Sequence, residues 1–146
     1  MTSGALPLTN ETAVTLVLPA RPEYLLLARL ALTGVARLAE PDEEALADVR
    51  LAVTEAAANA CRHAYADGAG DVTITLLLTA DERLEVVVED DGIGFERDGI
   101  AEWRPDELGE DGMGLAIIRA VADEVEIGPK ASGSGTRLRF TRSLRG

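Results

Sequence analysis

The chain has 146 residues, of which 47% are hydrophobic, so it has the size of one ordinary domain and enough apolar side chains for a core. Its net charge of −12 repels phosphate backbones, and its aromatic content of 3% offers few platforms for base stacking. Both properties argue against direct binding to nucleic acid.

The only cysteine and the N-terminal residues indicate the compartment. Cys61 has no partner for an intramolecular disulfide, which favours a reducing compartment, and we expect a small buried apolar residue there rather than a reactive thiol. Residues 1–7 lack a basic region followed by an apolar core, and no apolar run approaches about 18 residues. We therefore expect a soluble, cytoplasmic protein without membrane contact.

The first half of the chain predicts one strand and two helices. Residues 13–18 are typical of a short strand, which Pro19 ends. Leucines and a valine recur at helical spacing over residues 24–38, which predicts a first helix with a wide apolar face. A second helix is predicted from about residue 41 to residue 65, with acidic residues in its first turn that suit the helix dipole.

The second predicted helix carries polar side chains at steps of three and four residues. Glu55, Asn59, Arg62 and His63 share one side, beside a stripe with almost no side-chain bulk, formed by Ala52, Ala56, Ala60 and Ala64. The stripe lets the helix pack closely on the layer beneath, so a carboxylate and a carboxamide one turn apart are held rigidly, as a site requires. Spacing alone favours an ordinary solvated amphipathic helix over a functional site.

Two strands are predicted next, over residues 72–78 and 84–89. The apolar residues of the second strand share one face, and the period of two sends Asp90 to that same face. A carboxylate aimed at the core indicates a specific role. Gly92 and Gly94 follow directly, and glycines let the backbone approach a ligand closely or adopt a positive φ.

The remaining segment predicts a lid and a phosphate-binding helix start. Residues 96–111 have no periodicity and are rich in acids, which is typical of a lid or a binding loop. We expect Gly112-Met113-Gly114 to open a helix over residues 115–122, so that free N–H groups at the positive end of the helix dipole meet a glycine-rich turn. The last elements expected are strands over residues 125–127 and 136–140, the second directly after the turn 132–135.

Each of these motifs is weak alone, but their order is specific. The motifs occur in this order along the chain: a helical Glu-x-x-x-Asn, a strand ending in Asp-x-Gly-x-Gly, a long lid, a Gly-x-Gly at a helix start, and a Gly-Thr that enters the last strand. This order resembles the Bergerat ATP-binding fold of the GHKL superfamily of histidine kinase-like ATPases. Pro22-Glu-Tyr24, Val53-Thr-Glu-Ala-Ala-Ala-Asn59 with His63-Ala-Tyr65, and Ala122-Asp-Glu-Val-Glu126 look like the anti-sigma factor serine/threonine kinases of partner-switching systems.

The resemblance implies an α+β fold. We expect a two-layer α/β sandwich in which helices cover one face of a mixed, mostly antiparallel sheet. The expected histidine kinase-like ATPase domain spans residues 12–141 and follows a flexible N-terminus at residues 1–11.

The resemblance also implies a site for ATP and Mg²⁺. Asn59 would hold the Mg²⁺ that bridges the phosphates, and Glu55 would be the general base for the acceptor hydroxyl, which fits the need of phosphoryl transfer for positioning and charge neutralisation. Asp90 would accept a hydrogen bond from the adenine amino group. Gly92 and Gly94 would make room for the base, and Thr136 would add a hydroxyl near the adenine. The phosphates would meet the start of the next helix, at Gly112, Met113, Gly114 and Leu115.

The implied function is regulation by partner switching. Members of that family sequester an alternative sigma factor, phosphorylate a small antagonist of the STAS type on serine or threonine, and commonly form homodimers. Two alternatives stay open: a nucleotide-gated regulatory binding module without kinase turnover, and the detached catalytic domain of a sensor histidine kinase.

Four further residues have open or minor roles. Arg62 either reaches a phosphate or forms a surface salt bridge. His63 more typically caps or packs at a helix end than acts in catalysis, and Trp103 either anchors a partner or folds over the lid. Lys130 is the only lysine in the chain, so we expect no phosphate-binding lysine.

Overall fold

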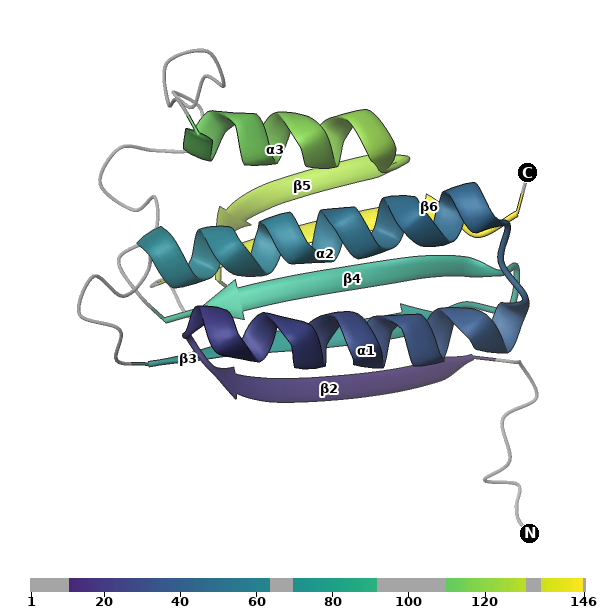
Figure 1. Ribbon diagram of the computed structural model, residues 1–146, viewed down its shortest axis with the longest axis horizontal. Coiled ribbons are helices and arrows are strands. Elements are labelled where there is room, and N and C mark those ends of the chain that lie inside the picture. Colours follow the sequence, from purple (N-terminus) through teal and green to yellow (C-terminus); the bar gives the residue numbers. More distant parts are fainter. Residues whose placement is uncertain (1–10, 64–69, 92–109, 131–134, 146) are drawn as a thin grey trace, which may run out of the picture.

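The protein folds into two layers, a β-sheet and a layer of helices (Figure 1). The structure is a computed structural model that describes residues 11–63, 70–91, 110–130 and 135–145. The helices of the described residues are η1 (Pro22–Tyr24), α1 (Leu25–Ala36), η2 (Arg37–Ala39), α2 (Glu43–His63) and α3 (Glu110–Val121). The strands are β2 (Thr12–Pro19), β3 (Asp71–Leu78), β4 (Arg83–Asp90), β5 (Glu124–Pro129) and β6 (Thr136–Ser143).

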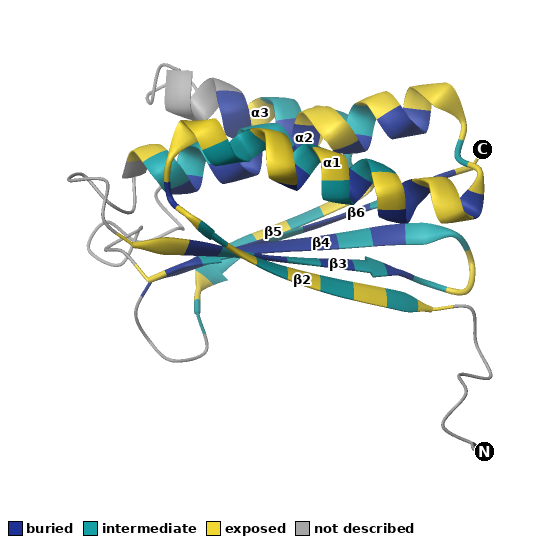
Figure 2. Ribbon diagram, turned by 60° about the horizontal axis from the view of Figure 1, so that its bottom comes forward, coloured by how far each residue is buried: buried dark blue, intermediate teal, exposed yellow. Residues whose placement is uncertain are grey.

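The five described strands form one sheet in the order β2-β3-β4-β6-β5. All four pairings between them are antiparallel. The helices cover one face of this sheet and leave the other face open (Figure 2). The predicted two-layer α+β arrangement is therefore confirmed. We expected a mixed, mostly antiparallel sheet, and the pairings between the described strands are all antiparallel.

The alternation of side chains along the central strands places the core between the two layers. In β3 and β4 every second residue is buried, as the period of two predicts. Asp90, at the end of β4, is 6% exposed and lies on the buried side with the apolar residues before it, as the alternation predicted. The side chains that are less than 2% exposed include Leu32, Leu46, Val53, Ile74, Leu76, Leu84, Val86, Ile118, Phe140 and Leu144.

Helix α2 is the centre of the helical layer. It packs against α1 on one side and α3 on the other, and it contacts β3, β4 and β6 (Figure 1). Ala52, Ala56 and Ala60 of the predicted stripe are 1%, 2% and 6% exposed, so the close packing expected of them is confirmed. Arg142 of β6 also ties the sheet to this helix, because its Nη2 lies 2.8 Å from Oδ2 of the half-buried Asp48.

Helix α3 begins earlier than the sequence predicted. Its first residue is Glu110, so Gly112 and Gly114 lie within its first turns instead of before it, and the last two residues of the expected lid are helical. No helix among the described residues is both long and apolar enough to span a membrane.

Candidate functional site

Helix α2 carries both the carboxylate and the carboxamide of the predicted site, and the start of α3 packs against them. Glu55 and Asn59 lie one turn apart on α2, are both half-buried and face the start of α3. A Cβ placed on Gly114 would lie 2.9 Å from Glu55 Oε1, 3.5 Å from Asn59 Oδ1 and 3.6 Å from Asn59 Nδ2. The absence of a side chain at Gly114 therefore gives the two functional groups their space, and these three residues form the first part of the candidate site.

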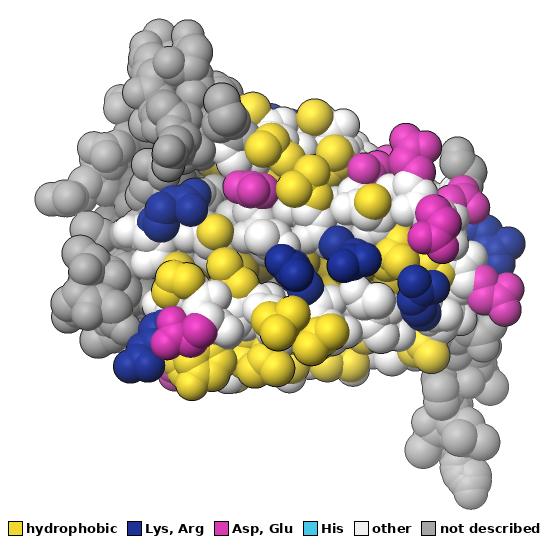
Figure 3. Space-filling view, in the orientation of Figure 1, with side chains coloured by type: hydrophobic (Ala, Val, Ile, Leu, Met, Phe, Trp, Pro, Cys, Tyr) yellow, Lys and Arg dark blue, Asp and Glu magenta, His cyan; other side chains and the backbone are white. Residues whose placement is uncertain are grey.

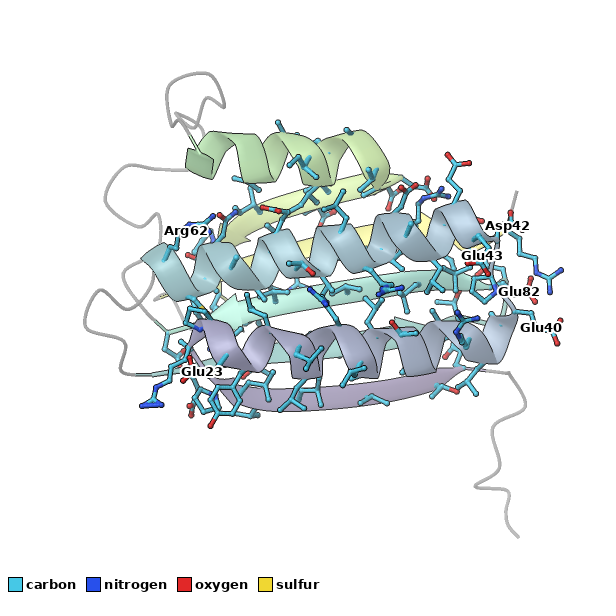
Figure 4. All side chains as sticks on the ribbon, in the orientation of Figure 1. Glu23, Glu40, Asp42, Glu43, Arg62 and Glu82 are labelled. Carbon is cyan, nitrogen blue, oxygen red and sulfur yellow. The ribbon has the colours of Figure 1, made fainter. Side chains whose placement is uncertain are left out.

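Arg62 orients the carboxamide of Asn59. Its Nη2 donates a hydrogen bond of 2.8 Å to Asn59 Oδ1 across one turn of α2. Figure 4 shows Arg62 near the end of α2, whereas the acidic residues Glu40, Asp42 and Glu43 lie at the other end of the molecule. This guanidinium is thus the positive group next to the carboxamide, although the structure describes it as an exposed side chain.

The second part of the site lies where β4 ends and β6 begins. Asp90 and Thr136 are paired across these strands and are 6% and 7% exposed. Thr136 Oγ1 is buried and has no hydrogen-bond partner among the described residues. A buried hydroxyl without a hydrogen-bond partner lowers the stability of the fold by about 1–3 kcal/mol. A polar ligand beside Asp90 that bonded to this hydroxyl would remove that cost.

Gly135 packs directly on the carbonyl of Asp90. Its φ is +86°, a backbone conformation that favours glycine, and a Cβ there would lie 2.0 Å from Asp90 O and 3.0 Å from the Cα of Asp91. Any side chain at this position would push the two strands apart. The Gly-Thr pair that the sequence placed before the last strand is thus needed to bring Thr136 next to Asp90.

The end of α2, the start of α3 and the end of β4 lie at the same end of the molecule (Figure 1). The two parts of the site therefore share one end of the fold. Leu115 is 2% exposed and belongs to the core, so only its backbone is a candidate for ligand contact. Gly92, Gly94, Trp103 and the expected lid up to residue 109 lie outside the described residues, while Gly112 and Met113 are placed by the backbone of α3 alone.

Sequence reasoning missed one ion pair near the site. Lys130 Nζ lies 2.5 Å from Oδ1 of Asp91, the residue after Asp90. The two residues are 39 positions apart, and only the sheet register brings them together, so no local motif could have indicated the pair. Among the described residues, no group of three or more His, Cys, Asp or Glu side chains is arranged to hold a metal ion.

The comparisons with known proteins agree with this fold. Residues 18–142 match the family described as the histidine kinase-like ATPase domain, and the chain belongs to this ATP-binding family. Individual relatives show which members of this family the chain resembles. Serine-protein kinase RsbW of Listeria monocytogenes serotype 4a (strain HCC23) is 38% identical to it over 128 residues, which cover 82% of this chain and 81% of that protein.

Two further relatives extend the comparison. Serine-protein kinase RsbW of Bacillus subtilis (strain 168) is 35% identical over 146 residues, which cover 94% of this chain and 89% of that protein. A crystal structure of the RsbU and RsbW domains of Rv1364c from Mycobacterium tuberculosis has a TM-score of 0.67 with 22% identity and covers 91% of this chain and 32% of that chain. At that identity the structure demonstrates a shared fold only. The chain is thus a homologue of the RsbW serine-protein kinases, and the family resemblance predicted from its motifs is confirmed.

Proposed function

We propose that this chain is an ATP-dependent protein serine/threonine kinase that phosphorylates an anti-sigma factor antagonist and also sequesters an alternative sigma factor. The observation that carries the proposal is the convergence of Glu55 and Asn59 on the space left by Gly114. The names of the relatives, which are serine-protein kinases, support the same activity.

The residues at the ends of β4 and β6 fit an adenine base. A buried carboxylate accepts a hydrogen bond from an amino group, and the hydroxyl of Thr136 can donate to or accept from a ring nitrogen or a bridging water. These two groups are paired across the strands, and the hydroxyl has no partner among the described residues. Asp90 would therefore select adenine by its exocyclic amino group, and Gly92 and Gly94 would make room for the base.

The residues on α2 and α3 fit the phosphates and the acceptor. Bound Mg²⁺ would neutralise charge on the phosphate oxygens, and Asn59 Oδ1, which also accepts from Arg62, would be its protein ligand. The start of α3, with Gly112 and Met113 in its first turn, would direct backbone N–H groups at the phosphates, and Gly114 would keep the adjoining space free of a side chain. These groups bind and orient the triphosphate, so that chemistry depends on placing the acceptor hydroxyl in line with it.

Glu55 would remove the proton of the acceptor. Its carboxylate lies beside Asn59 and is half-buried, so it can accept the proton of a serine or threonine hydroxyl as that oxygen attacks the γ-phosphorus atom. The bond from the γ-phosphorus to the β–γ bridging oxygen breaks, and ADP leaves with the bridging oxygen. The phosphoserine or phosphothreonine then belongs to the antagonist.

Phosphotransfer with Glu55→Gln tests this proposal. The probes are radiolabelled ATP with Mg²⁺ and the STAS-type antagonist proteins of the source organism. We expect wild type to label one of them, and Glu55→Gln to label it about 10²–10⁴ times more slowly with unchanged ATP affinity. Glu44→Gln, in the first turn of the same helix, is the matched control. Equal rates for wild type and Glu55→Gln would contradict the role of Glu55, and no labelling by wild type would favour a regulatory module without turnover.

A patch of unpaired arginines supports a site for an acidic partner segment. Figure 3 shows Lys and Arg side chains along the boundary between α1 and α2, on the face turned away from the sheet. In this part of the described chain Arg29, Arg37 and Arg50 have no ion pair or hydrogen bond from their side chains, which is unusual in a protein with a net charge of −12. We assign this arginine patch to the sigma factor or the antagonist. Arg50→Glu should weaken one of these complexes and leave ATP affinity unchanged.

The β2 edge of the sheet supports a homodimer. The opposite edge strand, β5, carries Glu124, Glu126 and Pro129, which discourage pairing with another strand, whereas β2 has no charged residue over its eight positions. Leu26, Leu27 and Leu30 of the adjoining α1 are 54%, 47% and 58% exposed. A second copy that covers this edge would bury them, and Leu30→Lys should convert a dimer into a monomer in sedimentation experiments.

A further inference from the structure

Three strands end or begin in one row beside the proposed adenine site. Thr136 opens β6 and is paired with Asp90 on one side and with Pro129 on the other. Because β4 and β5 both run antiparallel to β6, the next residues of these two strands, Asp91 and Lys130, lie on opposite sides of Gly135. The backbones of β4 and β5 are about 10 Å apart, which a lysine and an aspartate side chain can bridge together.

The ion pair between Lys130 and Asp91 closes this gap. The distance from Nζ to Oδ1 is 2.5 Å, and the lysine side chain is 23% exposed against 69% for the aspartate. The pair thus crosses Gly135, the residue before β6, which already packs against the carbonyl of Asp90. A link of this kind resists movement of the start of β6 away from the end of β4.

The choice of residue type at this position is also distinctive. The chain has 14 Lys and Arg residues, and Lys130 is the only lysine among them. An ammonium group is a compact point charge on a flexible stem, which allows it to reach one carboxylate across the intervening strand. The charge also neutralises Asp91 directly beside Asp90, so the site presents less negative charge to a nucleotide.

We infer that Lys130 is a positioning residue for nucleotide binding: its ion pair with Asp91 joins the ends of β4 and β5 across the start of β6, which lies between them, and so holds Asp90 and Thr136 together. The inference rests on the proposed adenine site. It assigns Lys130 to the base and not to the phosphates, because the Glu55, Asn59 and Gly114 group lies on α2 and α3. Lys130 therefore affects the binding of every adenine nucleotide to the same degree.

Titrations of adenosine, ADP and ATP into the full chain test the inference. We expect Lys130→Gln and Asp91→Asn each to weaken the binding of all three ligands by about three- to five-fold, the range that partly exposed ion pairs provide. The double variant should be no weaker than either single one, and Lys130→Arg should stay within about two-fold of wild type, since a guanidinium still pairs with Asp91. Arg83→Gln, which breaks the ion pair of Arg83 with Asp123 at the other end of the sheet, is the matched control.

The single lysine also allows a direct spectroscopic test. In protein labelled with ¹⁵N on lysine, one Nζ signal should appear, and its exchange with water should be slow in wild type and faster in Asp91→Asn. A loss of affinity that grows from adenosine to ATP would overturn the inference in favour of a phosphate contact, and unchanged affinities in Lys130→Gln would overturn it altogether. If wild type binds none of the three ligands, the proposed adenine site itself is wrong.

Discussion

Glu55 on α2 occupies space that a side chain at Gly114 on α3 would need: a Cβ at position 114 would lie 2.9 Å from Glu55 Oε1. Such a distance is too short for a carbon and an oxygen that are not bonded, so one of the two must move. The carboxylate is the far end of a flexible side chain, so it will move before the helices do. A substitution at Gly114 should therefore affect the stability of the fold less than it affects the activity of the site.

Gly114→Ala should separate stability from activity. The free energy of unfolding should change by no more than about 1 kcal/mol, because alanine favours a helix by about that amount and offsets the displacement of Glu55. Phosphotransfer should fall at least about ten-fold, since the general base leaves its position. Gly34→Ala is the control, because Gly34 is also helical and a Cβ there would have no neighbour within 4 Å. Urea unfolding and phosphotransfer rates check both variants, and a Gly114→Ala variant with full activity would contradict the role of this space.

Thr136→Val should make the protein more stable and bind nucleotide less well. The hydroxyl is buried without a partner among the described residues, so its removal should raise the free energy of unfolding by about 1 kcal/mol. The same change removes a group that we assign to the adenine, and ATP affinity should fall about three- to ten-fold. Thermal unfolding with and without ATP measures both effects. If the variant lost stability and kept its affinity, the hydroxyl would be a structural group and not a ligand contact.

The thiol of Cys61 should give the stability a distinct dependence on pH. Cys61 is half-buried against the core, and burial raises its pKa above the ordinary value of 9.0. The unfolded thiol ionises first as the pH rises, so its contribution to stability is complete below the unfolded pKa and is lost between the unfolded and the folded pKa. The free energy of unfolding of wild type should therefore fall more steeply above pH 9 than that of Cys61→Ala. Parallel curves from pH 7 to 10.5 would show that the thiol is not shielded from water.

Most of the fold could be predicted because it follows local periodicity. The alternation in β4 predicted the burial of Asp90, and the alanine stripe of α2 predicted a helix that packs closely, and the structure agrees in both cases. Cys61 was expected to be a small buried residue, and the structure places it beside the core but buries it only in part.

The remaining features depend on tertiary contacts that no local pattern contains. Gly114 looked like the residue before a helix, but it lies inside α3, where the neighbouring Glu55 excludes a side chain. The link between Lys130 and Asp91 depends on the register of three strands. The placing of Gly135 against Asp90 has the same origin, since the two residues are 45 positions apart in sequence (135 minus 90) and meet only in the sheet.

The central claim is that Asp90 binds the adenine of ATP, and calorimetric titration of ATP with Mg²⁺ tests it most directly. Asp90→Asn keeps the size of the side chain but removes its charge and replaces one of its two acceptor oxygens by an NH2 donor, so the hydrogen bond from the adenine amino group is weakened. Asp81→Asn, in the turn at the other end of β4, makes the same charge change and is the control. We expect wild type and Asp81→Asn to bind ATP alike and Asp90→Asn to bind it at least about 50-fold more weakly. Equal binding by wild type and Asp90→Asn would contradict it.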